Sequence, residues 1–340
     1  MTIATPPFND LVAHAIASHG GVSPEQLIVC DNSSKYQPNG FQSNTNPEAN
    51  LAAIFKTMAN LNQTALEDPA ICAGSHGPSF RGALLEATDE IASLAAGRSI
   101  RYIELGPEPW KSRVILTQLL AVGAQLQQYV GVDINPESEQ TMRDTLVPVI
   151  GADRFTYWVE DFYQCSIQDC PKVSHTGVAG SDEDTLTVVT NLGFQEGNDL
   201  PTRIGPMLTR ITQPGDLLLS EMQVSCGDAG AEAIRQFYHH PEMHRFSSLV
   251  GQCFDSGVRM SGKHVFHLVP LQTDVGRVPV AATLVPVHIH GQKKYVLTNS
   301  CLKYTVEQFH QARELSGNFV VKWWGETGDQ SVVFQLSERR

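Results

Sequence analysis

The chain has 340 residues, of which 41% are hydrophobic and 18% are charged, and its formal net charge is −12. This composition excludes an intrinsically disordered chain, which would have fewer apolar and more charged residues. The acidic balance also argues against binding to a nucleic-acid backbone or an anionic membrane through a broad basic surface. The length predicts one large domain or two coupled ones.

The cysteines and the N-terminal residues indicate where the protein resides. Seven cysteines are spread over the sequence, and only Cys165 and Cys170 lie close together, which does not match a zinc ribbon. Residues 1–10 lack the charged and apolar regions of a signal peptide, and no segment is apolar enough to span a membrane. We therefore expect a soluble cytoplasmic protein with reduced thiols.

The first hundred residues read as helices interrupted by one loop. Apolar spacing predicts helices over 7–30, 51–64 and 80–96. The segment 31–50 is rich in Asn, Ser, Pro and Gly, which is typical of a loop. We expect this loop to line the entrance of a ligand site and Tyr36 to contact the ligand.

From residue 99 onward, short apolar strands alternate with helices. The expected strands are 99–106, 127–134, 154–162, 185–193 and 216–224. The expected helices between them are 111–122, 136–149 and 201–212. This alternation predicts a doubly wound parallel sheet.

The last third of the chain changes character. Residues 228–262 read as helical, 263–300 as β-rich, and 319–336 as a hairpin with a Gly-containing turn. We therefore expect an α/β fold: a doubly wound, Rossmann-like sheet with a C-terminal hairpin, and a second α+β domain that caps the ligand crevice. The predicted cap domain comprises 1–75 with 225–297, and the predicted sheet domain comprises 76–224 with 298–340.

In open α/β sheets, ligands bind beyond the carboxyl ends of the strands. The first expected strand ends in Glu104 and Gly106, the second in Asp133, and the third in Asp161 and Phe162. Gly106 lets a ligand approach the backbone closely. Asp133 is placed to bind ribose hydroxyls, and Asp161 with Phe162 to hold an adenine. Acids at strand ends also occur as caps of solvated loops, which is the alternative interpretation.

The turn after Gly106 narrows the choice of cofactor. It reads Pro107-Glu108-Pro109 and so lacks the glycines of the dinucleotide-binding GxGxxG motif, and no P-loop motif occurs. A carboxylate in this turn would repel a pyrophosphate. A nucleoside cofactor without phosphates is favoured, and S-adenosylmethionine is the common one.

The histidine-specific methyltransferases resemble this chain in three segments, YIELGPEPWKSRVIL, YVGVDINPES and WVEDFY. That family includes the ergothioneine-pathway histidine Nα-methyltransferase and the ergot-alkaloid dimethylallyltryptophan N-methyltransferase. The resemblance covers about 80–340, with a gap across 225–290. It implies a class I methyltransferase sheet and S-adenosylmethionine as the cofactor. The cofactor-binding residues that it implies are Glu104, Gly106, Lys111, Asp133, Asp161 and Phe162.

The chain departs from that family where the methyl acceptor would bind. Asn299 stands where the family has a Glu, Cys301 where it has a Ser, and Phe194 where it has an Asn. Asn191 lies near Phe194, and Glu221 ends a strand, so both are further candidates for acceptor contacts. In the cofactor turn, Glu108 replaces the second Gly of the family, so the methionine end of the cofactor would be held differently.

These departures make the expected acceptor pocket less charged and more apolar than a histidine site. We therefore expect N-methylation of a small amine, an amino-acid-derived or an alkaloid-like metabolite other than histidine. Two alternatives remain open: an O- or C-methyltransferase of a secondary metabolite, and a non-catalytic binding subunit with a methyltransferase fold. A nucleotide-dependent dehydrogenase is disfavoured by the missing GxGxxG. No catalytic base is identified, and the oligomeric state is not indicated.

Two groups of histidines have spacings found in some metal sites. His240 and His244 are four residues apart, and His288 and His290 alternate along an expected strand. Neither group has an acid-rich set of ligands nearby, and Pro241 interrupts the first. Surface or core histidines are the simpler interpretation, so no metal site is expected.

Overall fold

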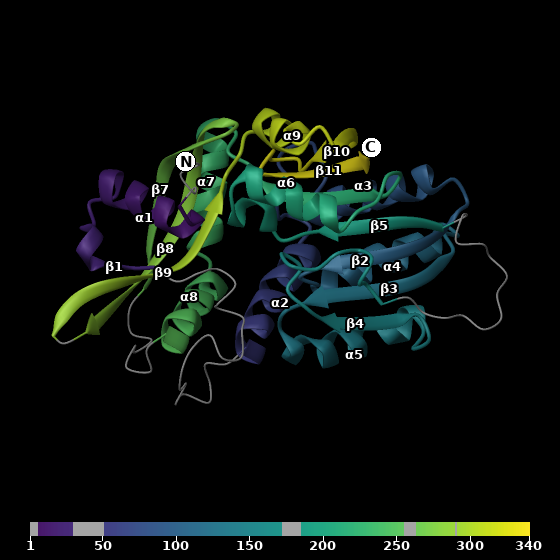
Figure 1. Cartoon of the computed structure of the whole chain (residues 1–340), viewed down its shortest axis with the longest axis horizontal. Helices are drawn as coiled ribbons and strands as arrows, with labels where there is room; N and C mark the ends of the chain where they lie inside the picture. Colours follow the sequence, from purple (N-terminus) through teal and green to yellow (C-terminus); the bar gives the residue numbers. More distant parts are fainter. Residues whose placement is uncertain (1–5, 30–50, 172–184, 255–262, 290) are drawn as a thin grey trace.

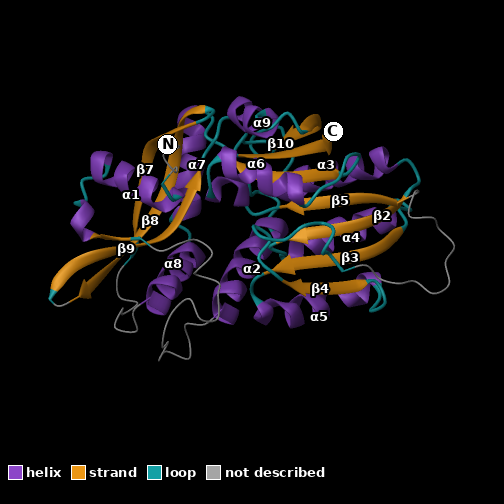
Figure 2. Cartoon of the chain, in the orientation of Figure 1, coloured by secondary structure: helices purple, strands orange, loops and turns teal. Residues whose placement is uncertain are grey.

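The computed structural model describes residues 6–29, 51–171, 185–254, 263–289 and 291–340. Figure 1 shows two β-sheets side by side, each covered by helices, and Figure 2 shows the same arrangement by type of element. In this part of the chain, no helix is long and apolar enough to cross a membrane. A hydrophobic cluster that includes Val269 and Leu284 of one sheet also includes Met222 and Val333 of the other, so the two layered units share part of their core.

The larger sheet has the strand order β10-β11-β6-β5-β2-β3-β4. Its strands are β2 (Ser99–Leu105), β3 (Leu126–Asp133), β4 (Phe155–Val159), β5 (Thr185–Asn191), β6 (Leu217–Gln223), β10 (Phe319–Glu326) and β11 (Val332–Arg339). Strands β2 to β6 pair in parallel, whereas β11 pairs antiparallel with both β6 and β10. The predicted doubly wound sheet with its C-terminal hairpin is therefore confirmed.

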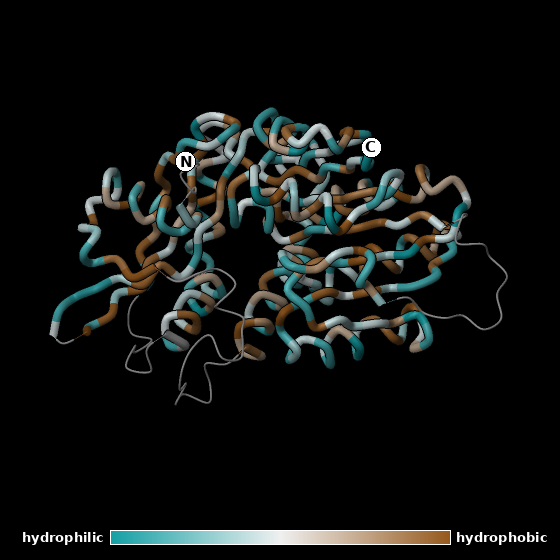
Figure 3. Tube along the Cα trace, in the orientation of Figure 1, coloured by the Kyte–Doolittle hydropathy of each residue, from teal (hydrophilic) through white to brown (hydrophobic). Residues whose placement is uncertain are grey.

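Helices bury both faces of this sheet. Those described here are α3 (Phe80–Ala95), α4 (Pro109–Ala121), α5 (Glu139–Ile150), α6 (Pro201–Arg210) and α9 (Val306–Glu314). Along β2, Tyr102 faces the core formed with α3, α4 and α5, and its neighbour Ile103 faces the core formed with α6. Because both faces are covered, the central strands carry apolar side chains on both sides, and Figure 3 shows hydrophobic stretches along them.

The smaller sheet has the order β1-β9-β8-β7. Its strands are β1 (Leu27–Ile28), β7 (Val265–Thr273), β8 (Gly276–Ile289) and β9 (Gln292–Leu302). Its helices are α1 (Phe8–His19), α2 (Leu51–Glu67), α7 (Gly227–Tyr238) and α8 (Pro241–Phe254). On β8, Ala282 packs in the core that includes α1, and its neighbour Ala281 packs in the core that includes α8. This second α+β unit confirms the cap that the fold class includes.

Three details differ from the sequence predictions. The helix expected over 7–30 ends at His19, because Gly20 and Gly21 follow it and Gly21 has a φ of +71°; Pro24–Gln26 is a 3-10 turn. The helix expected over 228–262 is divided into α7 and α8 before Pro241, whose ring lacks the N–H that a continuous helix requires. The expected domain boundary between 297 and 298 falls inside strand β9.

Candidate functional site

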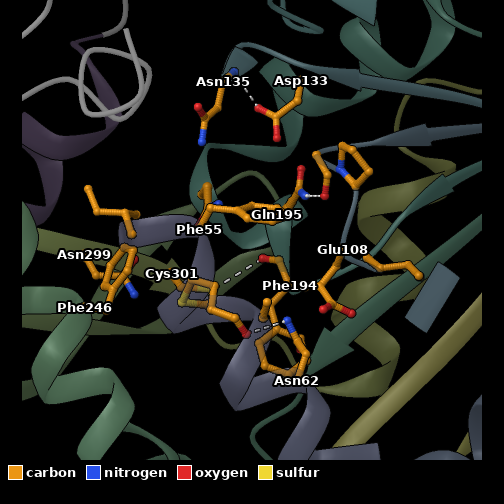
Figure 4. A pocket seen from close by; sticks show the side chains of 18 of the residues that line it. Phe55, Asn62, Glu108, Asp133, Asn135, Phe194, Gln195, Phe246, Asn299 and Cys301 are labelled. Atoms are coloured by element: carbon orange, nitrogen blue, oxygen red, sulfur yellow. Dashed lines mark hydrogen bonds between the residues drawn. The ribbon is translucent and has the colours of Figure 1, made fainter. Parts of the chain in front are cut away.

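One cleft of about 250 Å³ lies at the carboxyl edge of the large sheet, slightly below the volume of typical small-molecule sites (Figure 4). Its floor comes from the ends of β2, β3, β4 and β5, and its opposite wall from α2, α7, α8 and β9. The sequence predictions that line it are Gly106, Lys111, Asp133, Asp161, Phe162, Phe194, Asn299 and Cys301. The structure therefore brings together residues from strands that are far apart in the sequence.

Asp133 is the last residue of β3 and faces the cleft. Its Oδ1 accepts a hydrogen bond from the backbone N–H of Asn135 at 3.0 Å, and Figure 4 shows the two side by side. Burial raises the pKa of Asp133 to about 6. Asn135 also lines the cleft, although no sequence motif points to it. The pair offers a carboxylate and an amide, the groups that bind hydroxyls.

Asp161 and Phe162 follow β4 at the adjacent end of the cleft. The Oδ1 of Asp161 accepts the backbone N–H of Tyr163 at 2.9 Å. The rings of Phe162 and Tyr163 stack with centroids 4.9 Å apart, and both residues line the cleft. An apolar ring beside an acid suits a flat heterocycle with an amino group.

Gly106 forms the turn between β2 and α4. Its φ of +57° is a left-handed conformation that favours glycine, and a Cβ there would collide with the side chain of Gln195. Gln195 Nε2 donates to the carbonyl oxygens of Leu105 at 3.1 Å and Gly106 at 3.3 Å. Sequence reasoning missed Gln195, because nothing in its local sequence shows that the loop after β5 folds over the turn after β2.

Glu104 lies behind the cleft wall and is not part of the lining. It accepts hydrogen bonds from the hydroxyls of Ser112 at 2.5 Å and Tyr129 at 3.0 Å. Burial raises the pKa of Glu104 to about 7. The sequence predicted a direct cofactor contact for Glu104, and the structure places it beneath the turn that carries Gly106 and Glu108, where its carboxyl also accepts the backbone N–H of Glu108 at 3.4 Å.

Lys111 and Glu221 form a buried ion pair at the inner end of the cleft. The Nζ of Lys111 donates to both carboxylate oxygens of Glu221, at 2.9 and 2.8 Å, and neither side chain is more than 1% exposed. Lys111 lines the cleft, but Glu221 lies behind it. Asn191 is also outside the lining, and both polar atoms of its buried side chain lack a hydrogen-bond partner in the described residues.

Glu108 caps the N-terminus of α4 and lines the cleft. Its Oε2 accepts the backbone N–H of Lys111 at 2.8 Å, whereas its buried Oε1 has no partner within the described residues. Burial raises the pKa of Glu108 to about 8. A carboxyl oxygen left without a partner in a ligand cleft is available to a donor on the ligand.

The opposite end of the cleft is mostly apolar. Phe194, whose φ is +63°, packs edge-on against Phe237 with ring centroids 5.7 Å apart. The helices add further apolar side chains that the sequence reasoning did not select: Ile54, Phe55, Met58, Tyr238, Met243 and Phe246. Asn62, Asn198 and Asn299 supply amides in this lining. In a sequence, apolar positions on a helix follow the same spacing whether the side chains face a core or a cleft.

Lys303 is a second buried lysine, behind the apolar end. Its Nζ donates to Cys301 Sγ at 3.4 Å and lies 5.0 and 5.2 Å from the ring centroids of Phe194 and Tyr238. In the described part of the chain, no carboxylate lies within ion-pair distance of it. Burial lowers the pKa of Lys303. Sequence reasoning did not assign this lysine a role.

The remaining predictions concern Tyr36 and the histidines. Tyr36 and the whole segment 31–50 lie outside the described residues, as does His290. The Nδ1 of His240 accepts a hydrogen bond from the backbone N–H of Glu242. The rings of His244 and His264 pack together with their centroids 4.0 Å apart. Where the structure describes the chain, no group of three or more His, Cys, Asp or Glu residues is arranged to hold a metal ion.

Neither a model of a known protein family nor a protein of curated function matches the sequence. Among solved structures, the CcbJ methyltransferase from Streptomyces caelestis is similar at 11% identity over 82% of this chain and 96% of that one, with a TM-score of 0.42. An S-adenosylmethionine-dependent methyltransferase from Clostridium acetobutylicum is similar at 8% identity over 75% and 90%, with a TM-score of 0.42.

The glycopeptide N-methyltransferase MtfA, complexed with sinefungin, is similar at 11% identity over 83% of this chain and 97% of that one, with a TM-score of 0.39. Likenesses this distant assign no residue a role and no activity to this chain. Any function has to be inferred from the cleft itself.

Proposed function

We propose that the protein is an S-adenosylmethionine-dependent methyltransferase that transfers a methyl group to a nitrogen of a small, largely apolar amine. The observation that carries this proposal is the order of side chains along the strand ends. Phe162 and Asp161 follow β4, Asp133 ends β3, and Gly106 follows β2, and these three strands are neighbours in the sheet. Adenine, ribose and the group beyond the ribose can therefore lie across them in this order.

The charges in the cleft support a cofactor without phosphates. Lys111 is the basic side chain among the described lining residues, and its Nζ is held by both oxygens of Glu221. Glu108 lines the same space, and its buried Oε1 has no partner within the described residues. A pyrophosphate would meet a carboxyl and an already paired ammonium, whereas a sulfonium or an ammonium would be favoured. This observation disfavours a nicotinamide dinucleotide.

The residues fit the cofactor in two further respects. The turn of Gly106, against which Gln195 packs where a Cβ would lie, lines the cleft, and the carboxyl of Asp133 faces the cleft at the place expected for two ribose hydroxyls. When bound, S-adenosylmethionine supplies an activated methyl group on a positively charged sulfur. The chain's part in the reaction is then to align an acceptor lone pair with that methyl group and to exclude water.

The acceptor end favours an uncharged, bulky amine. Its rings and methionines lower the polarity around the acceptor, which disfavours an ammonium and so favours the neutral amine with a free lone pair. The amides of Asn62, Asn198 and Asn299 can orient a polar group without supplying a charge. Histidine, with an ammonium and an imidazole, meets no carboxylate among the described residues of that end, so we propose an aromatic or alkaloid-like amine in its place.

Two measurements test this function. Isothermal titration calorimetry with S-adenosylmethionine and S-adenosylhomocysteine should give binding of both, and NAD should not bind. A methyl-transfer screen of amino acids, biogenic amines and alkaloid-like amines, read by mass spectrometry, should give a methylated aromatic amine. Efficient methylation of histidine would contradict the acceptor part. Cofactor binding without methylation of any amine would favour an O- or C-methyltransferase or a binding subunit.

A further inference from the structure

Glu108 lies in the turn that follows β2, and within the described residues only one of its two carboxyl oxygens accepts a hydrogen bond. Its Oε2 accepts the backbone N–H of Lys111 and so caps α4. Its Oε1 is buried and has no partner within the described residues, and the whole residue is 9% exposed. Leaving a buried carboxyl oxygen unpaired is costly, so a donor from a ligand would relieve this cost.

The position of Glu108 identifies the part of the ligand that it would meet. Asp133 and the turn of Gly106 and Glu108 stand at the ends of the adjacent strands β3 and β2. If Asp133 holds the ribose, as the proposed function states, the adenine lies toward β4 and the opposite substituent of the ribose lies over this turn. In S-adenosylmethionine that substituent is the methionine chain, which carries an ammonium.

The surrounding charges favour an ammonium at this place. Glu104, Glu108 and Glu221 lie around a single lysine, Lys111, whose Nζ is bonded to both oxygens of Glu221. Three carboxyls therefore share one cation, and Glu108 is the one of the three that lines the cleft. A second cation brought by the ligand would complete the pairing.

We propose that Glu108 binds the ammonium of the methionine chain of S-adenosylmethionine through its unpaired Oε1. This inference rests on the proposed function and adds a specificity-determining residue to it. It gives a purpose to the carboxylate that stands where the resembling family has a glycine. It also predicts that the protein distinguishes the intact cofactor from analogues that lack the amino-acid part.

Calorimetry with two ligands tests this contact. S-Adenosylhomocysteine carries the ammonium, whereas 5′-methylthioadenosine has the same adenosine and thioether but no amino-acid part. Glu108→Gln should weaken binding of S-adenosylhomocysteine by roughly 10- to 100-fold, as expected for one lost charge-assisted hydrogen bond. Binding of 5′-methylthioadenosine should change less than about threefold. Glu137→Gln, which changes an exposed acid outside the cleft, is the matched control and should alter neither affinity.

Proton release gives a second readout. Burial raises the pKa of Glu108 to about 8, so at pH 7 its carboxyl is largely protonated before the ligand binds. An ammonium at its oxygen favours the ionised form and should release the proton. Titrations of the wild type at pH 7 in phosphate and in Tris should therefore differ in apparent enthalpy, and Glu108→Gln should reduce that difference, with any remainder due to Glu104 and Asp133, whose pKa values burial also raises.

The outcomes separate this inference from the function on which it rests. If Glu108→Gln binds S-adenosylhomocysteine like the wild type, or if it weakens both ligands equally, the ammonium contact is refuted and the methyltransferase proposal stands. If the wild type binds neither ligand, both proposals fail. Circular dichroism and thermal unfolding of Glu108→Gln exclude an unfolded variant as the cause of lost binding.

Discussion

At the end of the cleft formed by the large sheet, Lys111 is buried against a carboxylate, whereas at the end formed by the smaller sheet, Lys303 is buried among aromatic rings and a thiol. Lys111 donates to both oxygens of Glu221, and Lys303 donates to Cys301. Phe194 lies between them, 6.0 Å from the first ammonium and 5.0 Å from the second. The two ends therefore present different chemistry to a ligand: charged side chains at one end and a largely apolar wall at the other.

This difference teaches how one cleft can take two dissimilar ligands. The end with Asp133, Glu108 and the paired Lys111 suits a charged and hydroxylated molecule. The end with Phe237, Met243 and similar side chains suits an apolar one. A methyl donor and an apolar methyl acceptor are such a pair, and each end can be altered separately.

The largest effect is expected when the ion pair at the sheet end is broken. Lys111→Met leaves the carboxylate of Glu221 buried and uncompensated, which should lower the free energy of unfolding by about 3–5 kcal/mol. Urea denaturation followed by circular dichroism measures this change. The double variant Lys111→Met with Glu221→Gln should recover much of the loss, and the exposed Lys56→Met should change little. A loss below about 1 kcal/mol in the single variant would contradict the importance of the pair.

A smaller effect concerns ligand affinity at the same end. Asp133→Ala should weaken binding of S-adenosylhomocysteine by about 3 kcal/mol, or roughly 100-fold, because two hydroxyls lose a charge-assisted acceptor. Calorimetry measures the affinity, and the exposed Asp153→Ala serves as the control. Unchanged affinity in folded Asp133→Ala would show that the ribose does not lie at the end of β3.

The next prediction concerns the link between the loop after β5 and the cofactor turn. Gln195→Ala leaves the carbonyls of Leu105 and Gly106 without their side-chain donor, which should lower the free energy of unfolding by about 2 kcal/mol. Urea denaturation again provides the measurement. Gln164→Ala, at an exposed position, is the control, and equal stabilities of the two variants would refute the role of Gln195.

Gln195 also illustrates the limit of sequence reasoning for this molecule. Gly106 and Asp133 were predictable, because strand and helix alternation places strand ends at one edge of a parallel sheet. The position of Gln195 depends on Phe194, whose left-handed backbone begins the 3-10 turn Gln195–Asn198 after β5. No sequence motif predicts that conformation. The apolar wall was unpredictable for another reason: Met243 and Phe246 have the helical periodicity of ordinary core residues.

The smallest effect on stability is expected at the apolar end, and it should depend on pH. Lys303 has no described carboxylate partner, so Lys303→Met, with a side chain of similar volume, leaves no opposite charge unpaired. The free energy of unfolding at pH 7 should therefore change by less than about 1.5 kcal/mol. This is the reverse of the expectation for Lys111→Met.

The pH dependence follows from the pKa of Lys303, which burial lowers from its usual 10.5. Between the lowered pKa and 10.5, the unfolded chain binds more protons at this lysine than the folded one, so this group makes the wild type more stable as the pH rises through that range. Lys303→Met lacks this contribution. Urea denaturation of both proteins from pH 7 to 10 should therefore give a wild type that gains stability relative to the variant as the pH increases. A difference that stays constant over this range would mean that the Lys303 ammonium is as well stabilised among the rings and the thiol as it is in water, and the contrast between the two lysines would then be lost.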